Sequence, residues 1–204
     1  GTNMDTIPDN MIYGDRTSAL FGKSVAGAGD VNGDGVSDII VGEPGGGTNY
    51  TGKAFLYLNA LKGNDVADEY FTGVAHDSLG YSVAGAGDVN GDGYDDVIVG
   101  VPGKNSHAGA TYIYFGPRIN PSTPDVTLTE NLLISDDQFG FSVASAGDVN
   151  GDGYSDVIVG APYFNSALGS GDHIGRAYIF YGGTSMHSIP DFSYSNNIAH
   201  SFVG

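Results

Sequence analysis

The sequence contains no cysteine, so no disulfide bond can take part in the fold. Basic residues are also scarce: seven Lys and Arg stand against 24 Asp and Glu, and the formal net charge is -17 at pH 7. Such a charge repels nucleic acid and anionic membranes at long range and attracts cations and basic surfaces. The sequence also has no run of eighteen apolar residues. We therefore exclude a disulfide scaffold, nucleic-acid binding and insertion into a membrane.

What the sequence does contain is enough apolar material for a core. Hydrophobic residues make up 40% of the 204 positions and aromatic residues 11%. A disordered acidic segment of this charge would have a much lower hydrophobic content. The composition indicates a folded acidic protein, and the absence of cysteine fits an extracellular protein of bacterial or archaeal type.

Three copies of one pattern organise the chain. Each copy opens with Phe or Leu, Gly, a variable residue and Ser-Val-Ala, and the glycines Gly22, Gly80 and Gly140 lie 58 and 60 residues apart. Each copy continues into Gly-Asp-Val-Asn-Gly-Asp-Gly and closes with Val-Gly-x-Pro. A repeat of this length predicts a series of similar structural units.

The apolar segments of each copy predict strands and no helix. A β-branched run bounded by Gly and Pro is typical of a buried strand, and aromatic residues favour a second strand after a variable loop. A weaker strand precedes each Phe-Gly or Leu-Gly pair and is clearest at Val126–Ile134. We therefore expect four-stranded antiparallel meander sheets whose tyrosine and phenylalanine side chains form the core. The clearest expected strands are 38–44, 96–102 and 156–162, and 54–58, 110–115 and 177–181.

The acidic segment of each copy carries oxygen-bearing side chains at loop positions 1, 3, 5 and 9. A turning backbone can direct these side chains to one point, and the backbone carbonyl of position 7 can join them. Calcium fits such a site, because it accepts six to eight oxygen ligands in irregular geometry, whereas magnesium requires an octahedron and softer metals prefer His and Cys. The predicted ligands of three Ca²⁺ ions per chain are Asp30, Asn32, Asp34, Val36 and Asp38; Asp88, Asn90, Asp92, Tyr94 and Asp96; and Asp148, Asn150, Asp152, Tyr154 and Asp156.

Two other interpretations of this loop fit the residues less well. An EF-hand needs a glutamate at position 12 and flanking helices, but position 12 is Val41, Val99 or Val159 inside an apolar strand. A turn without metal would hold three carboxylates close together, and their repulsion lowers stability unless a cation offsets it. The calcium loop is therefore the preferred interpretation.

In combination, these elements resemble the FG-GAP repeats of the integrin α-subunit β-propeller and of related microbial surface proteins. The likeness extends over nearly the whole chain, because several separate elements recur in order three times. The resemblance implies an all-β fold of β-propeller blades, with one four-stranded antiparallel sheet per repeat, about three blades in this chain, and a calcium loop between the first and second strands. We expect a single partial or self-associating propeller unit over 1–204, with repeats at about 1–59, 60–116 and 117–182 and a fourth begun by 183–204.

No catalytic residues are predicted, and we expect a binding protein rather than an enzyme. The sequence has no Gly-x-Ser-x-Gly motif and no cysteine, and its five histidines lack the spacing of metal ligands. The loops between the second and third strands should lie opposite the metal loops, and they vary in length and composition, as recognition loops do. These loops span 43–52, 101–109 and 161–175, and their candidate ligand contacts are Tyr50, His107, Tyr163, Phe164 and His173.

The leading hypothesis is a calcium-binding module at the cell surface or outside the cell. The integrin resemblance implies adhesion or recognition of a protein or glycan ligand on the face opposite the calcium loops. The alternative is a calcium-stiffened structural or assembly repeat of a larger surface protein or filament.

The two ends of the chain carry related segments, since residues 1–9 closely match 183–191. Closed propellers usually have four to eight blades, and three blades alone would leave sheet edges exposed. We therefore expect the ring to be completed by further blades or by self-association of copies of the chain.

Overall fold

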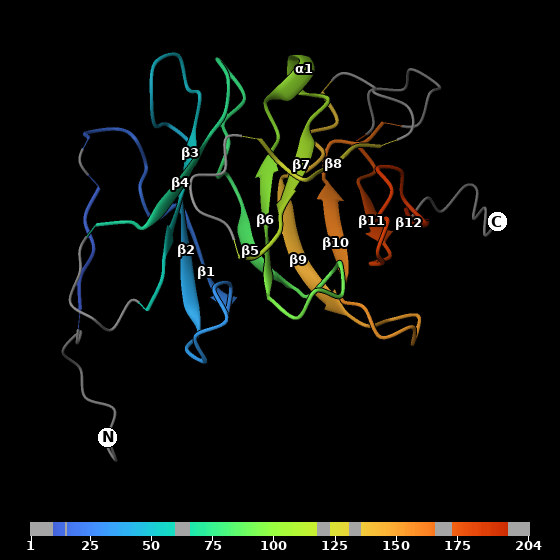
Figure 1. Ribbon diagram of the computed structural model, residues 1–204. Helices are drawn as coiled ribbons and strands as arrows, with labels where there is room; N and C mark the ends of the chain where they lie inside the picture. Colours follow the sequence, from blue (N-terminus) through green and yellow to red (C-terminus); the bar gives the residue numbers. More distant parts are fainter. Residues whose placement is uncertain are drawn as a thin grey trace, which may run out of the picture.

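The computed structural model describes residues 10–14, 16–59, 66–117, 123–130, 136–165 and 173–195. These residues form three four-stranded antiparallel sheets in which consecutive strands pair (Figure 1). The expected all-β fold of meander blades is therefore confirmed. No helix among the described residues is long and apolar enough to cross a membrane.

Each blade consists of four strands in chain order. The first blade contains β1 (Ser24–Gly29), β2 (Asp38–Glu43), β3 (Lys53–Tyr57) and β4 (Glu69–Thr72). The second contains β5 (Val83–Gly87), β6 (Asp96–Val101), β7 (Ala110–Tyr114) and β8 (Val126–Leu128), with one short turn, α1 (Lys104–His107), between β6 and β7. The third contains β9 (Ser142–Gly147), β10 (Asp156–Ala161), β11 (Arg176–Phe180) and β12 (Phe192–Tyr194).

The outer strand of each blade comes from the segment that leads to the next repeat. β4 pairs with β3, although residues 69–72 lie within the span 60–116 assigned to the second sequence repeat. In the same way β8 pairs with β7, and β12 pairs with β11. A sheet and a sequence repeat are therefore offset by one strand.

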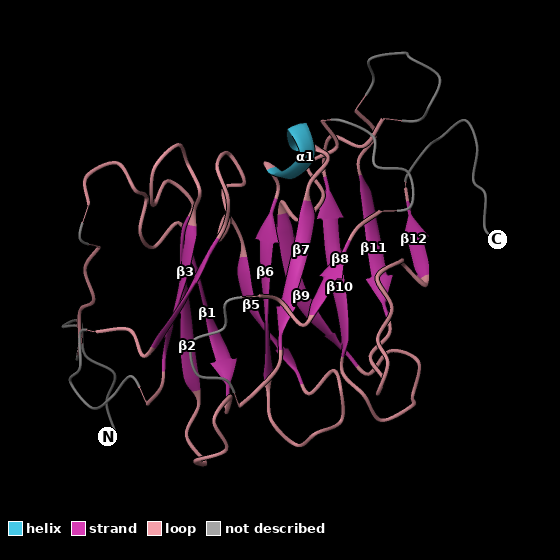
Figure 2. Cartoon of the chain, turned by 45° about the horizontal axis from the view of Figure 1, so that its top comes forward, coloured by secondary structure: helices cyan, strands magenta, loops and turns pink. Residues whose placement is uncertain are grey.

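The blades stand side by side in chain order, with their inner strands in contact (Figure 2). β1 packs against β5, and β5 packs against β9. The β1–β2, β5–β6 and β9–β10 loops lie at the lower end in Figure 1, and α1 lies at the upper end with the β2–β3 loop. The metal-loop candidates and the variable loops thus occupy opposite ends of the sheets.

The core fills the two spaces between blades. One cluster joins the first and second blades, where the rings of Phe71 and Tyr114 lie 4.1 Å apart, centroid to centroid. The other joins the second and third blades around Phe139, which contacts the rings of Tyr178 and Phe180. Every residue of β6 is buried because this strand has a blade on each side, which explains why its sequence is apolar without alternation.

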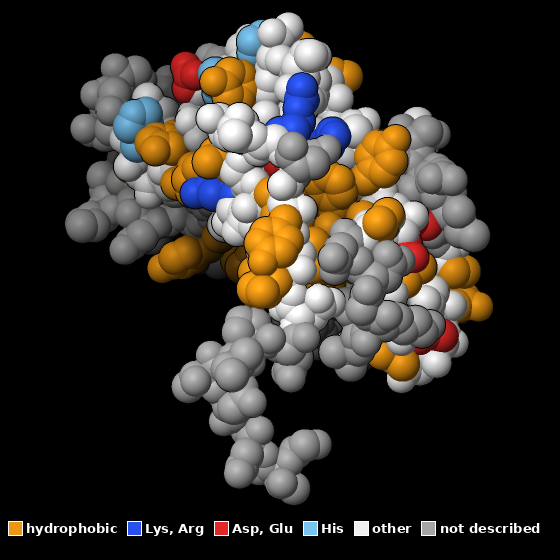
Figure 3. All heavy atoms as spheres, turned by 90° about the vertical axis from the view of Figure 1, so that its left-hand side faces the viewer, with side chains coloured by type: hydrophobic (Ala, Val, Ile, Leu, Met, Phe, Trp, Pro, Cys, Tyr) orange, Lys and Arg blue, Asp and Glu red, His pale blue; other side chains and the backbone are white. Residues whose placement is uncertain are grey.

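The outer faces of the first and third blades lack such a neighbour among the described residues. On the first blade, Val25 is 67% exposed and Tyr70 57% exposed, and Figure 3 shows hydrophobic side chains spread over this side of the molecule. On the third blade, every residue of β12 is exposed. At each end of the row of blades, one sheet face therefore has no neighbouring blade among the described residues.

Candidate metal loops and recognition face

The three metal-loop candidates share one internal geometry. In the second loop, Asp88 Oδ1 accepts the amide hydrogens of Gly91 (2.6 Å) and Asp92 (3.1 Å), and Asp88 Oδ2 accepts that of Gly93 (2.9 Å). Asp92 Oδ1 in turn accepts the amide hydrogen of Tyr94 at 3.0 Å. The third loop repeats all four bonds, and the first loop repeats those donated by the amides of positions 5, 6 and 7. The glycine at position 6 has φ between 84° and 94° in all three, a conformation that requires glycine.

The aspartate at position 9 is fully buried in all three loops, at 0% exposure. In the second loop, Asp96 Oδ2 accepts the amide hydrogen of Val89 (2.8 Å), and Asp96 Oδ1 accepts that of Gly116 (3.0 Å). Burial raises the pKa of Asp96 to about 7, and the negative charges of Asp92 and Asp88 contribute to this rise. Burial and two loop aspartates likewise raise the pKa of Asp38. The loop therefore holds carboxylates close enough to repel one another.

The donor set fits a hard divalent cation. Each loop supplies three carboxylates, one amide oxygen and a position-7 carbonyl, and it contains no Lys, Arg or His that could balance the charge. In the part of the chain that the structure describes, no group of three or more His, Cys, Asp or Glu side chains already converges as a metal cluster. The position-1 and position-9 oxygens accept backbone amide hydrogens. Oxygens that accept one hydrogen, such as Asp88 Oδ2 and both oxygens of Asp96, keep a second lone pair.

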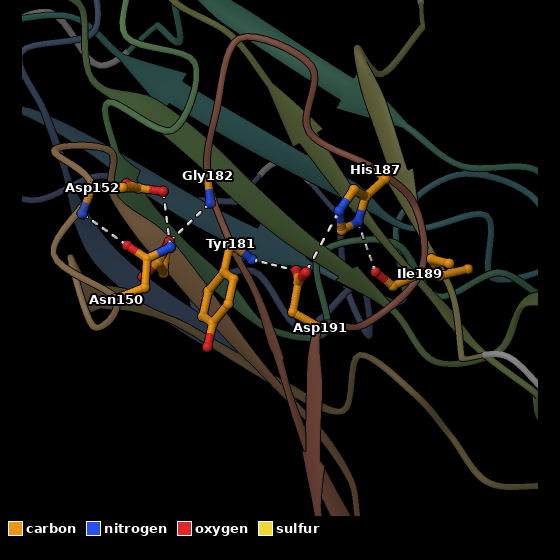
Figure 4. Close-up of polar contacts among 8 residues, drawn as sticks. Asn150, Asp152, Tyr181, Gly182, His187, Ile189 and Asp191 are labelled. Atoms are coloured by element: carbon orange, nitrogen blue, oxygen red, sulfur yellow. Dashed lines mark hydrogen bonds and ion pairs between the residues drawn. The ribbon is translucent and has the colours of Figure 1, made fainter. Parts of the chain in front are cut away.

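The metal loops are attached to the outer strands by further aspartates, which the sequence did not single out. In the third blade, Gly182 N donates to Asp156 Oδ1 at 2.8 Å. Figure 4 shows the neighbouring contact, in which Tyr181 N donates to Asp191 Oδ2 at 2.8 Å. His187 Nε2 lies 3.5 Å from the other oxygen of Asp191. In the first two blades, Asp68 and Asp125 hold the equivalent backbone amides. The aspartate before each outer strand therefore braces the strand that supports the loop.

Four of the five predicted ligand contacts are exposed at the end opposite the metal loops. Tyr50 is 64% exposed and Tyr163 39% exposed, and His107 and His173 are also exposed. Phe164 is different, because it is only 2% exposed and the Arg176 guanidinium lies 3.7 Å from its ring centroid. The expectation for Phe164 is therefore corrected: its ring belongs to the core of the third blade.

Tyr163 and His173 belong to a longer aromatic row that connects the third blade with the second. The rings of Tyr163 and His173 lie 5.3 Å apart, Tyr163 contacts Phe141 at 6.2 Å, and Phe141 contacts Tyr81 at 4.7 Å, all between centroids. At the far end, the Lys23 ammonium lies 5.1 Å from the Tyr81 ring centroid. Lys23, Tyr81 and Phe141 occupy the variable position between Phe-Gly or Leu-Gly and Ser-Val-Ala, which is the signal that could have identified them.

A buried acidic pair lies at the same end of the third blade. Asp137 Oδ1 accepts the amide hydrogen of Asn165 at 3.2 Å, and Glu130 Oε2 accepts the hydroxyl hydrogen of Tyr178 at 2.7 Å. Burial, followed by the neighbouring Glu130, raises the pKa of Asp137 to about 7. The same two causes raise the pKa of Tyr178. This pair was not predicted from the sequence.

Comparison with known proteins matches the model of the FG-GAP repeat at residues 21–57, 79–114 and 139–180. Integrin alpha-5 of Xenopus laevis is 36% identical over 174 residues, which cover 80% of this chain and 15% of that protein. Integrin alpha pat-2 of Caenorhabditis elegans is 37% identical over 191 residues, which cover 85% of this chain and 15% of that protein. The chain therefore spans only a small part of the length of these relatives.

Proposed function

This chain belongs to the FG-GAP repeat family, and from that membership we propose that it is a calcium-binding, extracellular or cell-surface propeller module for adhesion or ligand recognition. One observation supports the proposal: the same acidic loop geometry recurs at one end of the blades, and variable loops with aromatic residues lie at the opposite end. No catalytic role is included, because the family match and the resemblance to integrin α subunits support binding.

Calcium is assigned to the three acidic loops, one ion in each. In the second loop, Asp88, Asn90, Asp92 and Asp96 would hold the ion through side-chain oxygens, together with the Tyr94 carbonyl. The first and third loops would use their equivalent residues. The ion would supply the positive charge that the crowded carboxylates require and so stabilise the folded loop. Dissociation constants of about 10⁻⁴ to 10⁻³ M are typical of extracellular calcium modules.

Counting bound ions by native mass spectrometry tests this assignment. We expect three Ca²⁺ per chain in the wild-type protein and two in Asp92→Ala. Asp136→Asn is a matched control, since it removes the charge of an aspartate that is 76% exposed and lies outside the loops. A wild-type protein that binds no calcium would contradict the proposal.

The aromatic row supports ligand recognition on the face opposite the calcium loops. Lys23 above Tyr81 shows that a cationic group fits against these rings, and the net charge of -17 attracts basic partners. We favour a protein ligand that presents a basic side chain, and a glycan that stacks on the rings is the other candidate. Tyr50 and His107 would add contacts from the first and second blades.

An array of proteins and glycans, probed with and without calcium, tests this recognition role. Tyr163→Ala and Tyr81→Ala should weaken binding of any ligand that is found. Tyr194→Ala is the control, because Tyr194 is 66% exposed on the outer strand β12, away from the row. Equal loss of binding in Tyr194→Ala would contradict the assignment of the face.

A structural or assembly role is the second candidate, and the exposed outer faces of the first and third blades favour it. These faces could be covered by further blades or by another copy of the chain, which we propose as the partner. Two copies would make a six-bladed ring, whereas open head-to-tail association would make a filament. Light scattering in calcium tests self-association, and a compact 21.0 kDa monomer at all concentrations would contradict it.

A further inference from the structure

Asp95, the residue at position 8 of the second acidic loop, forms hydrogen bonds with the first acidic loop. Asp95 Oδ2 accepts the amide hydrogen of Asp30 at 2.7 Å, and the amide of Asp95 donates to the carbonyl oxygen of Asp30 at 3.2 Å. Asp30 is the position-1 residue of the first loop, in the neighbouring blade. Both backbone polar groups of a proposed ligand residue are thus held by one residue of the next blade.

The same contact recurs between the second and third blades. There Ser155, at position 8 of the third loop, donates its amide hydrogen to the carbonyl oxygen of Asp88 at 3.0 Å. The tyrosines at position 7 also contact the preceding loop. The Tyr94 ring lies against Gly33 of the first loop, and the Tyr154 ring lies against Gly91 of the second loop. The first and second loops are therefore each covered by positions 7 and 8 of the loop that follows.

We propose that position 8 is a positioning residue for the cation site of the preceding blade, and that the calcium sites are therefore filled cooperatively. This inference rests on the proposed calcium function. Asp95 stands between Tyr94 and Asp96, the position-7 and position-9 ligands of the second site. An ion that immobilises these two residues also immobilises Asp95, so the first site loses less conformational freedom when its own ion binds.

The coupling differs between the two interfaces. Asp95 adds a charge-assisted hydrogen bond from its carboxylate, whereas Ser155 contributes its backbone amide. The first and second sites are therefore coupled more strongly than the second and third. Coupling between binding sites commonly changes an affinity by 5- to 150-fold, and we expect loss of the Asp95 carboxylate to weaken the first site about tenfold.

A calcium titration followed by ¹⁵N–¹H NMR tests the inference site by site. The position-6 glycine amides of Gly35, Gly93 and Gly153 report the first, second and third loops separately. In Asp95→Ala, the titration midpoint of Gly35 should rise about tenfold, while that of Gly153 stays at its wild-type value. In Asp95→Asn, which keeps an acceptor oxygen without the charge, the Gly35 midpoint should lie between those of the wild type and Asp95→Ala.

Two controls separate coupling from a general loss of stability. Ser37→Ala changes position 8 of the first loop, an exposed residue with no hydrogen bond to another loop among the described residues, and Asp136→Asn removes the charge of a carboxylate that is 76% exposed and lies outside the loops. Both should leave the Gly35 midpoint unchanged. A shift of Gly35 in the controls equal to that in Asp95→Ala would overturn the inference, as would an unchanged Gly35 midpoint in Asp95→Ala. If no glycine of the wild-type protein responds to calcium, the proposed calcium function fails instead.

Discussion

Glycine in the Val-Gly-x-Pro segment provides a sharp test of the interblade packing. Gly42, Gly100 and Gly160 occupy equivalent positions, one residue before the end of β2, β6 and β10. A Cβ atom on Gly100 would lie closer than 3.0 Å to the backbone carbonyl oxygen of Gly140, in the third blade. Because that oxygen belongs to the backbone, the whole neighbouring blade must shift to make room.

The expected magnitude follows from two opposing effects. Replacing Gly by Ala restricts the unfolded chain and stabilises a tolerant site by about 0.4–1 kcal/mol, whereas overpacking a filled interior costs about 1–3 kcal/mol. In Gly100→Ala the second effect dominates, so we expect a net loss of about 1–2 kcal/mol. For a chain of this length, that loss lowers Tm by about 2–4 °C per kcal/mol.

Gly160→Ala is the matched control. Its Cβ would meet the hydroxyl of Ser142, a short exposed side chain that can rotate away, and no backbone atom closer than 3.9 Å. We expect urea unfolding in saturating calcium to give Gly160→Ala a free energy of unfolding close to that of the wild type, and Gly100→Ala a clearly lower one. Equal losses in both variants, or none in Gly100→Ala, would refute the packing between the second and third blades.

Three further predictions concern the metal loops and the buried acidic pair. EDTA should lower Tm and added calcium should restore it, because calcium binds the folded loops; a Tm that is indifferent to EDTA would count against the ions. Asp92→Ala should leave Asp88 and Asp96 poorly neutralised, so limited proteolysis should increase between Gly87 and Val101; an unchanged digestion pattern would show that Asp92 is not a ligand. In folded protein, the pKa of Asp137 is raised from 3.8 to about 7, so its protonated form is favoured and the free energy of unfolding should fall as pH rises from about 4 to 7. Urea unfolding across this range, in saturating calcium, should show a flatter profile for Asp137→Asn, and an identical profile would contradict the shift.

Local features of the sequence were sufficient to predict the second and third strands of each blade and the acidic loops. The strand expected over 126–134 was too long, because β8 ends at Leu128 and residues 129 and 130 belong to no strand. The β-branched runs became β2, β6 and β10, and the aromatic runs became β3, β7 and β11. The acidic loops lie between the first and second strands of each blade, as the resemblance implied. These features depend on a few consecutive residues, since side-chain alternation, turn glycines and carboxylate spacing act over short stretches of chain. Whether the loops hold calcium stays a prediction.

Tertiary contacts determined which side chains are buried and which partners they meet, and local sequence patterns could not predict either. Phe164 and Tyr163 are adjacent aromatic residues in the same loop, yet the Phe164 ring is buried beneath Arg176. The Tyr163 ring is 39% exposed and belongs to the row that reaches Tyr81 of the second blade through Phe141. Asp95 and Asp96 are likewise adjacent, yet Asp96 closes its own loop and Asp95 holds the loop of the neighbouring blade. In each pair the two neighbours point in different directions along one backbone, and the partner of each is set by how the blades pack. That packing joins residues about 60 positions apart. Local sequence therefore determines the individual strands, and only the contacts between strands and sheets determine which segment completes each blade and which side chains are exposed, shared or buried.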